Sequence, residues 1–450
     1  MNKIHWRLIA FVIIVIGLRA GNAQTANIAY LLVIGYALSG RMQAIQALSL
    51  SWLFIMINPG LAPSVGMAGL YRYGVLLAAL ISVVLRKKSQ QENNQKLNMF
   101  IWYTIGLGLF FIIHSLVISP IPDVSILKAL SWLIAMVTVL LGWSGLAKSE
   151  RDQLATHLYR GLVLILILSL PLAFFPVGYL VNGTGFQGVL NQPQAFGPVM
   201  GVLGAWSAAR LFAAPRPPWW LVGLVGVCLA MVLMSEARTA GFSFVLGVSF
   251  SLVFSPAFAN VGISHMAPGI KSSRLWVVFF FVLVAGISMS AAISQKASHY
   301  VTKSGRADVG GVIEAYDRSR GGGMKLMWRH FLENPWSGSG FGISSFPEQM
   351  DIIRDPIFHL PISASVEKGV TYLAVLEELG FIGGILVLVW LFMLLKGSAR
   401  GGLAPFAVCT TILLLNMGEA TLFSPGGVGL LYLILLGWVY SSGLTRNINE

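Results

Sequence analysis

Residues 369–395 read GVTYLAVLEELGFIGGILVLVWLFMLL. Nearly every side chain in this stretch is apolar, and a helix needs about 20 such residues to cross the hydrocarbon core of a bilayer. Lipid offers no hydrogen-bond partner to a backbone N–H or C=O group, so a lone segment that crosses it must be helical. The stretch therefore predicts a transmembrane helix.

Thirteen further stretches have the same apolar character. The fourteen predicted spans lie near 7–19, 24–40, 43–58, 67–85, 98–118, 125–146, 159–180, 194–212, 217–234, 238–255, 275–292, 369–395, 403–417 and 425–443. Several are short, so the sequence supports about 12–14 spans. The predicted fold is all-α, a polytopic transmembrane helix bundle. About 11 spans lie in 1–292, a large extracytoplasmic loop with short amphipathic helices occupies 293–368, and about three spans lie in 369–450.

The composition excludes the two or three soluble domains that 450 residues would otherwise suggest. Apolar residues make up 56% of the chain and charged residues 10%, against roughly 45–50% and about 25% in soluble domains. Both cysteines, Cys228 and Cys409, lie in apolar runs and indicate no disulfide framework. The net charge of +13 does not indicate nucleic acid as a partner, because no long basic run is present.

The basic residues predict the orientation of the chain. Cytoplasmic loops of membrane proteins carry an excess of Lys and Arg, and the loop at 86–96 holds Arg86, Lys87, Lys88 and Lys96. With that loop inside, alternation of the spans places both termini in the cytoplasm and 293–368 outside. Within 293–368, residues 324–333 have apolar side chains at helical spacing, which predicts an amphipathic helix on the outer membrane surface.

Three polar stretches fall on the outer side in this topology. The first, GFQGVLNQPQ at 185–194, fits a capped turn as well as a binding site. The second, SEART at 235–239, carries Arg238, which either snorkels, pairs with Glu236 or binds an anion. The third runs from SRGGGM at 319–324 to NPWSGSGFG at 334–342. It is not a dinucleotide fingerprint, because no strand precedes it and no βαβ unit surrounds it.

Together these stretches resemble the O-antigen polymerase and O-antigen ligase superfamily of bacterial envelope polysaccharide assembly. GVLNQPQAFG at 188–197 is similar to the family's Gly–Asn–Pro segment before a span, and SEARTAG at 235–241 is similar to its Ser–Arg–Thr–Ala-like start of a later span. As in the family's large outer loop, Arg320 stands fifteen residues before Pro335 and a Gly-x-Gly turn follows.

The resemblance covers about 185–395 and extends into the last large span. ELGFIG at 378–383 matches the family's Glu-x-Gly-x-x-Gly pattern. Ligase members usually carry a His–Asn pair eleven residues before the first Gly of that pattern, where this chain has Gly369 and Val370. The departure favours a polymerase over a ligase.

The resemblance implies a membrane glycosyltransferase of the bacterial inner membrane with a periplasmic active site. Its donor would be a polyprenyl-diphosphate-linked glycan, and a sugar hydroxyl would displace the lipid diphosphate. Arginine suits the diphosphate because its guanidinium binds phosphate through two parallel hydrogen bonds and stays charged. We therefore expect Arg238 and Arg320 to be catalytic, with Glu367 as first candidate and His359 as second for the base that takes the hydroxyl proton.

Other residues are expected to contact the substrate. They are Arg72, Arg306, Arg318, Gln187, Asn191, Gln194, Trp328 and Trp336. Glu378 is interpreted as structural, and Lys128 as a side chain that snorkels from a helix end. The chain has no Asp-x-Asp pair to hold a metal diphosphate, so no metal or other cofactor is expected.

Three functions compete at this point. The first is a polymerase of O-antigen or exopolysaccharide repeat units, and the second is a ligase that moves a glycan from polyprenyl diphosphate onto a lipid or protein acceptor. The third is a polysaccharide flippase or other transporter, which the absence of a visible internal repeat disfavours. The expected partners are the lipid bilayer and the lipid-linked glycan, and a chain-length regulator is a common partner in the family.

Overall fold

A computed structural model of the protein describes residues 3–86, 95–180, 185–277, 280, 321–354, 359–364, 366 and 368–444. The first helices are α1 (Lys3–Gly21), α2 (Ala23–Ala37), α3 (Arg41–Met56), α4 (Ala68–Leu85), α5 (Gln95–Ile118), α6 (Pro122–Ser144) and α7 (Lys148–Ser169). They are followed by the 3-10 helices η1 (Pro171–Phe174) and η2 (Pro176–Gly178), α8 (Pro193–Ala213), α9 (Trp219–Met234), α10 (Arg238–Ala259), α11 (Ile263–Met266) and η3 (Pro268–Lys271). The remaining elements are α15 (Gly322–Glu333), η5 (Pro347–Gln349), β1 (Ile352–Arg354), β2 (Pro361–Ala364), α16 (Thr371–Arg400), α17 (Leu403–Leu415) and α18 (Val428–Ser442).

The predicted all-helical class is confirmed, and the described sheet is a single antiparallel pair, β1 and β2. In the described part of the chain, seven helices are long and apolar enough to cross a membrane. They are α4, α6, α8, α10, α16, the Met99–Ile118 part of α5 and the stretch Lys148–Phe174. The shorter apolar helices α9, α17 and α18 do not reach that length.

Most of the predicted spans therefore correspond to a helix, but only seven described helices are long and apolar enough to cross a membrane. The predicted spans 24–40 and 43–58 become α2 and α3, which have 15 and 16 residues and fall short of the roughly 20 that a crossing needs. The predicted span 275–292 lies mostly outside the described residues. The predicted helix at 324–333 is present as α15.

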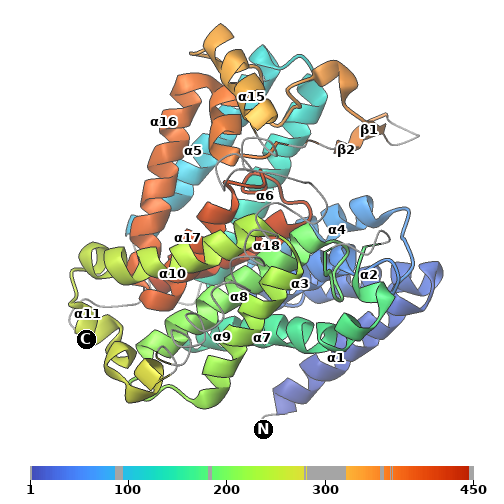
Figure 1. Cartoon of the computed structure of the whole chain (residues 1–450). Helices are drawn as coiled ribbons and strands as arrows, with labels where there is room; N and C mark the ends of the chain where they lie inside the picture. The colour runs from blue at the N-terminus through green and yellow to red at the C-terminus, as the bar shows by residue number, and fades with distance from the viewer. Residues whose placement is uncertain are drawn as a thin grey trace, which may run out of the picture.

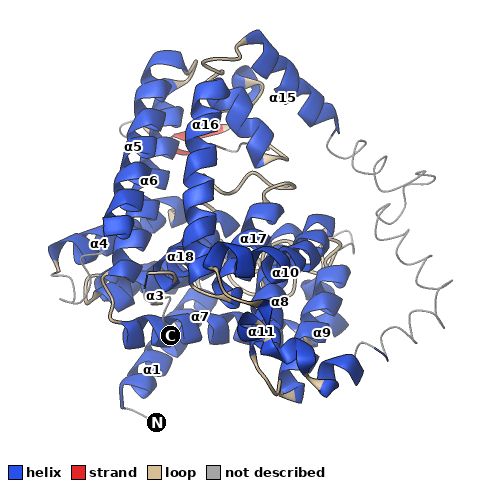
Figure 2. Cartoon of the chain, turned by 90° about the vertical axis from the view of Figure 1, so that its left-hand side faces the viewer, coloured by secondary structure: helices blue, strands red, loops and turns tan. Residues whose placement is uncertain are grey.

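The helices form two groups in space (Figures 1 and 2). α5, α6 and α16 stand upright and carry α15 and the β1–β2 hairpin at their upper end, whereas α7, α8, α10, α17 and α18 lie lower and across them. α18 is the most enclosed helix of the lower group, with 14 of its 15 residues buried, and 89% of the apolar window of α8 is also buried inside the protein. At the upper end, the loop that follows α15 meets the first part of α16.

Candidate functional site

A cavity of about 320 Å³ lies between α4, α6, β2, the start of α16 and the loop that precedes α18. This volume is in the range of small-molecule sites, which are roughly 300–1,000 Å³. The charged side chains on its wall are Arg72, Lys128, Lys368 and Glu378. Its wall collects charged side chains from α4, from α6 and from the segment around the start of α16, which are far apart in the sequence, and we therefore take it as the candidate site.

The aromatic residues beneath the cavity hold its walls in place. Phe341 and Phe423 line it. Phe341 stacks on Phe111 of α5 with 4.4 Å between ring centroids, and Phe423 lies 5.3 Å from the ring of Trp132 of α6. Buried aromatic pairs of this kind stabilise a protein beyond the area they bury. The loops that carry Phe341 and Phe423 are thus anchored to the upright helices.

Two of the three cations on the wall form no ion pair with a described carboxylate. The Nζ of Lys128 donates to the carbonyl oxygen of Gly342 at 2.7 Å, and the guanidinium of Arg72 lies 4.8 Å from the ring centroid of Tyr73. A charged side chain at membrane depth is costly unless it is paired or faces a polar cavity. Arg72 and Lys128 therefore give the cavity an unbalanced positive charge that suits an anion.

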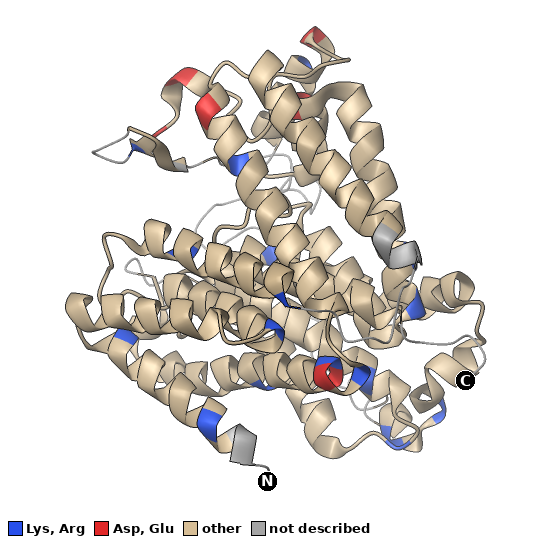
Figure 3. Ribbon diagram, turned by 180° about the vertical axis from the view of Figure 1, so that it is seen from behind, with Lys and Arg blue, Asp and Glu red and all other residues tan. Residues whose placement is uncertain are grey.

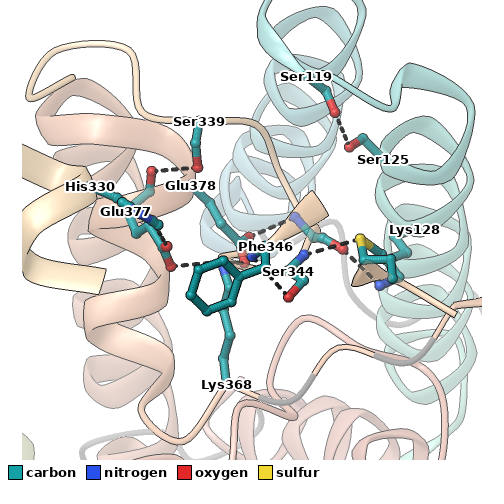
Figure 4. Close-up of polar contacts among 12 residues, drawn as sticks. Ser119, Ser125, Lys128, His330, Ser339, Ser344, Phe346, Lys368, Glu377 and Glu378 are labelled. Carbon is teal, nitrogen blue, oxygen red and sulfur yellow. Dashed lines mark hydrogen bonds and ion pairs between the residues drawn. The ribbon is translucent and has the colours of Figure 1, made fainter. Parts of the chain in front are cut away.

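The third cation, Lys368, is buried between two carboxylates of α16 (Figure 4). Its Nζ lies 2.8 Å from Glu377 Oε2 and 2.8 Å from Glu378 Oε1. Burial alone would lower the pKa of Lys368, but the charges of Glu378 and Glu377 outweigh burial and raise that pKa above its ordinary value. Lys368 is therefore held as an ammonium, and its charge is already compensated.

The backbone of the loop at 335–342 orients these carboxylates. α16 is interrupted at Gly380, whose φ of 63° and ψ of −167° are not helical. The N–H of Phe381 donates to the carbonyl oxygen of Pro335 at 2.7 Å, and the N–H groups of Ser339 and Gly340 donate to the carbonyl oxygens of Glu377 and Glu378, each at 2.9 Å. The loop thus supplies hydrogen bonds at the break in the helix, as non-helical backbone in a membrane protein requires.

Glycine is required where the loop and the helix approach each other. A Cβ atom on Gly338 would lie 2.5 Å from the carbonyl carbon of Glu378, and one on Gly380 would lie 2.5 Å from that of Trp336. Both glycines also have positive φ. The Gly-x-Gly turn and the Glu-x-Gly-x-x-Gly pattern, two separate motifs in the sequence, are therefore one packed unit in the structure.

Two further contacts complete this unit. The N–H of Gly342 donates to Glu378 Oε2 at 2.7 Å, so the backbone of Gly342 joins Glu378 to Lys128. His114 of α5 has its Nε2 2.5 Å from the carbonyl oxygen of Ser337. His114 is thus a buried histidine with a hydrogen bond to the loop.

The N-terminus of α18 also faces the cavity. Gly426 and Gly427 line the wall, and Gly427 is the N-cap residue with a φ of 51° and no side-chain hydrogen bond to the helix. The first N–H groups of a helix lack intrahelical partners and, with the helix dipole, favour an anion. The end of α18 adds to the positive field of Arg72 and Lys128.

The residues predicted to be catalytic are only partly described. Arg320 and Glu367, together with the predicted contacts Arg306 and Arg318, lie outside the described residues. Arg238 begins α10 and is not among the residues that line the cavity. Its neighbour Thr239 packs against Gly418, which stands two residues before the cavity residue Ala420.

His359 lies in the β1–β2 hairpin, away from the cavity wall. It is exposed and has a φ of 55°, and its carbonyl oxygen accepts from Arg354 Nη1 at 2.9 Å. The strand that follows it, Pro361–Ala364, does contribute to the wall. The hairpin thus brings Pro361, Ile362 and Ala364, and not His359, to the cavity wall.

The polar residues of the first stretch do not reach the cavity. Gln187 is buried and its Nε2 donates to the carbonyl oxygen of Tyr179 at 3.1 Å. The backbone N–H of Asn191 donates to Met56, and Gln194 is exposed. None of the three lines the cavity.

The first two stretches are, however, neighbours in space. The N–H of Phe186 donates to the carbonyl oxygen of Met234 at 2.9 Å. A Cβ atom on Gly197 would lie 2.5 Å from the Cβ atom of Ala237. The loop before α8 and the turn before α10 therefore form a second packed unit.

The predicted substrate residues on the α15 side are exposed. Trp328 and Trp336 present large apolar surfaces to the outside of the molecule. Arg72, by contrast, is the predicted substrate contact that the structure places in the cavity.

The sequence analysis did not predict several of the charged residues at the cavity. Glu378 was interpreted as structural and Lys128 as a snorkelling side chain, yet both line the cavity, while Glu377 and Lys368 were given no role. A signal for them was present, because two adjacent carboxylates inside an apolar span are rare and usually functional. Gly426 and Gly427 carried no comparable signal.

Comparisons with known proteins add no family or relative. No protein-family model matches the chain, and no curated protein matches it.

Proposed function

We propose that the protein is a membrane glycosyltransferase that polymerises polyprenyl-diphosphate-linked oligosaccharide repeat units. The observation that carries the proposal is the cavity in which Arg72, Lys128 and the start of α18 present positive charge without a described carboxylate partner. A diphosphate is an anion that matches such a wall. The motif resemblance supplies the sugar chemistry, and the cavity supplies a place for the leaving group.

The distribution of charge supports an outward-facing cavity. In Figure 3 the described Asp and Glu residues gather mostly at the end of the molecule that holds α15, whereas Lys and Arg are more frequent toward the opposite end. Lys and Arg concentrate on the cytoplasmic side of membrane proteins. We therefore place the α15 end, and the cavity beneath it, on the periplasmic side of the bacterial inner membrane, with both termini in the cytoplasm.

The proposed reaction makes distinct demands on the cavity. The acceptor hydroxyl attacks the anomeric carbon of the donor, the bond from that carbon to the diphosphate oxygen breaks, and the diphosphate leaves with the electron pair. Charge then grows on the phosphate oxygens, and fixed positive groups aimed at those oxygens lower the barrier. Arg72 grips two oxygens at once, Lys128 acts as a point charge, and the N–H groups at the start of α18 add directed hydrogen bonds.

The ion pairs of Lys368 have a different part in this scheme. Because Lys368 is neutralised by Glu377 and Glu378, it holds the wall together rather than adding a free charge. Arg238 and Arg320 remain proposed contacts to the donor. Glu367 remains the proposed base, with His359 as the second candidate.

The test uses purified protein in lipid nanodiscs with a polyprenyl-diphosphate-linked oligosaccharide as donor and acceptor. A ladder of oligomers supports the polymerase, and a single transfer to a different acceptor identifies a ligase. The variant Arg72→Gln should lower the rate by about 10²- to 10³-fold, the usual cost of removing one group that stabilises the developing charge. The exposed Arg216, in the loop between α8 and α9, provides the control variant Arg216→Gln.

Binding is measured separately with inorganic diphosphate. Wild-type protein and Arg216→Gln should bind it, and Arg72→Gln should bind it weakly. If Arg72→Gln binds diphosphate and forms the ladder as well as Arg216→Gln does, the cavity is not the site of the leaving group.

A further inference from the structure

Four titratable side chains connect the cavity to the outer surface of α15 (Figure 4). Glu378 lines the cavity, and its Oε1 lies 2.8 Å from Lys368 Nζ. Lys368 Nζ lies 2.8 Å from Glu377 Oε2, and Glu377 Oε1 lies 2.9 Å from His330 Nδ1. The outer contacts are hydrogen bonds and the Lys368–Glu377 contact is an ion pair, so an unbroken series of polar contacts leads from the cavity to His330.

The side chains in the middle of this series are buried, and the side chain at its outer end is partly exposed to solvent. The side chains of Lys368 and Glu377 are 2% and 0% exposed, whereas that of His330 is 24% exposed. The two middle members are therefore cut off from bulk water. His330 is the member at which the chain meets the solvent on the α15 side.

The charges of the four side chains, here called the cluster, would be balanced by one additional proton. Two carboxylates face one ammonium, so the cluster carries one negative charge when His330 is neutral. A buried group of ion pairs that only fixed the break in α16 would need Lys368 and its two partners. It would not need a partly exposed imidazole bonded to the deeper carboxylate, and an imidazole ring can accept a proton at one nitrogen and release one from the other.

We propose that this chain carries the proton of the acceptor hydroxyl from the cavity to water, with His330 as its exit. The inference rests on the proposed glycosyl transfer. As the acceptor oxygen bonds to the anomeric carbon, its O–H bond breaks, and the diphosphate departs with the electrons of the broken C–O bond. On this route Glu378, rather than Glu367 or His359, takes the proton, and the cluster gains the one positive charge that it lacks.

The proton then moves outward by successive exchange. Lys368 gives a proton to Glu377 Oε2 as it receives one from Glu378, and it remains an ammonium. The protonated carboxyl group of Glu377 rotates so that its proton faces His330. The Nε2–H tautomer of His330 accepts that proton at Nδ1, and the resulting imidazolium releases its Nε2 proton to water. One proton enters at the cavity and one leaves at α15, so no other reactant is needed.

The test is the variant His330→Asn. The amide nitrogen of Asn occupies about the position of Nδ1 and keeps the hydrogen bond to Glu377, but an amide does not take up a proton. We expect unchanged abundance and melting temperature, an unchanged KM for the lipid-linked donor, and a kcat lowered by about tenfold or more, since proton-transfer groups contribute roughly 10²- to 10⁴-fold. The slowed variant should also show a larger solvent deuterium isotope effect than the wild type.

A second variant distinguishes a loss of proton transfer from a loss of folding. His330→Ala leaves space for a free imidazole, which we expect to restore turnover to His330→Ala when added to the buffer. The exposed His265 of α11 supplies the control, and His265→Asn should behave as the wild type does.

The outcomes separate the two proposals. If the wild type makes product and His330→Asn turns over equally fast, the proton route is refuted while the glycosyltransferase stands. A loss of melting temperature in His330→Ala without rescue by imidazole also refutes the route, because it shows a structural role alone. If the wild type makes no product from the lipid-linked donor, the proposed function fails and the route fails with it.

Discussion

Replacing Gly380 with alanine should disrupt the unit that the loop at 335–342 forms with α16. The φ of 63° and ψ of −167° at Gly380 belong to a region that only glycine occupies readily. The added Cβ atom would also lie 2.5 Å from the carbonyl carbon of Trp336 and 2.8 Å from the nitrogen of Ser337. Both atoms belong to the backbone, so neither moves aside at low cost.

The magnitude follows from two contributions. A side chain in this backbone region costs about 1–3 kcal/mol, and forcing extra volume into a packed contact costs about 1–3 kcal/mol more. We expect Gly380→Ala to lower the free energy of unfolding by about 4 kcal/mol in total. The hydrogen bond from Phe381 N–H to the carbonyl oxygen of Pro335 lies next to Gly380, and we expect it to weaken first.

The assay is a thermal melt of the purified protein in detergent, combined with limited proteolysis of the loop at 335–342. Gly106 of α5 has open space where its Cβ atom would be, so Gly106→Ala is the matched control and should be neutral or slightly stabilising. We expect the melting temperature of Gly380→Ala to fall on the order of 5 °C or more, and proteolysis of the loop to become faster. Equal melting temperatures and equal proteolysis for the two variants would refute the idea that the glycine contact holds loop and helix together.

Three other predictions concern the charges around the cavity. Arg72→Lys should bind inorganic diphosphate more weakly than the wild type in a calorimetric titration, because the ammonium lacks the planar fork of the guanidinium; equal affinity would show that a point charge is sufficient. Lys368→Met should lower the free energy of unfolding by about 3–5 kcal/mol, because two buried carboxylates lose their partner, and adding Glu377→Gln and Glu378→Gln should recover part of that loss in a denaturant titration. Because the pKa of Lys368 is raised in the folded protein, the difference in unfolding free energy between wild type and Lys368→Met should have its full value below the ordinary pKa of 10.5. It should become smaller only as the pH rises above that value. A difference that becomes smaller between pH 7 and 9 would contradict the ion pairs.

The site also explains why two glycine-containing motifs occur so far apart in the chain. The turn at 338–342 and the pattern at 378–383 are separated by the hairpin that contributes β2 to the cavity wall. Their hydrogen bonds aim Glu377 and Glu378 at Lys368. A change in either motif should therefore be felt at the cavity, even though the glycines themselves bind no substrate.

The helical class could be predicted from the sequence because it depends on local properties. An apolar stretch of sufficient length forms a helix wherever it stands, since lipid leaves its backbone no other partner. Thirteen of the fourteen predicted spans coincide with helices of the described chain, α1 to α10 and α16 to α18. The bounds of α7 were less well predicted, since the span expected at 159–180 is the helix Lys148–Ser169. The ends of a helix depend on turns and contacts that hydropathy does not record.

The composition of the site was decided by tertiary packing alone. Arg72, Lys128 and Lys368 lie on separate segments, and each resembles a charge at the end of a span when it is considered by itself. Apolar helix faces are alike in sequence and do not specify which helices pair, so no local pattern shows that these three cations share one cavity. Only the fold brings the loop at 335–342 onto the break in α16, and that contact turns Glu377 and Glu378 from residues within an apolar helix into partners of Lys368.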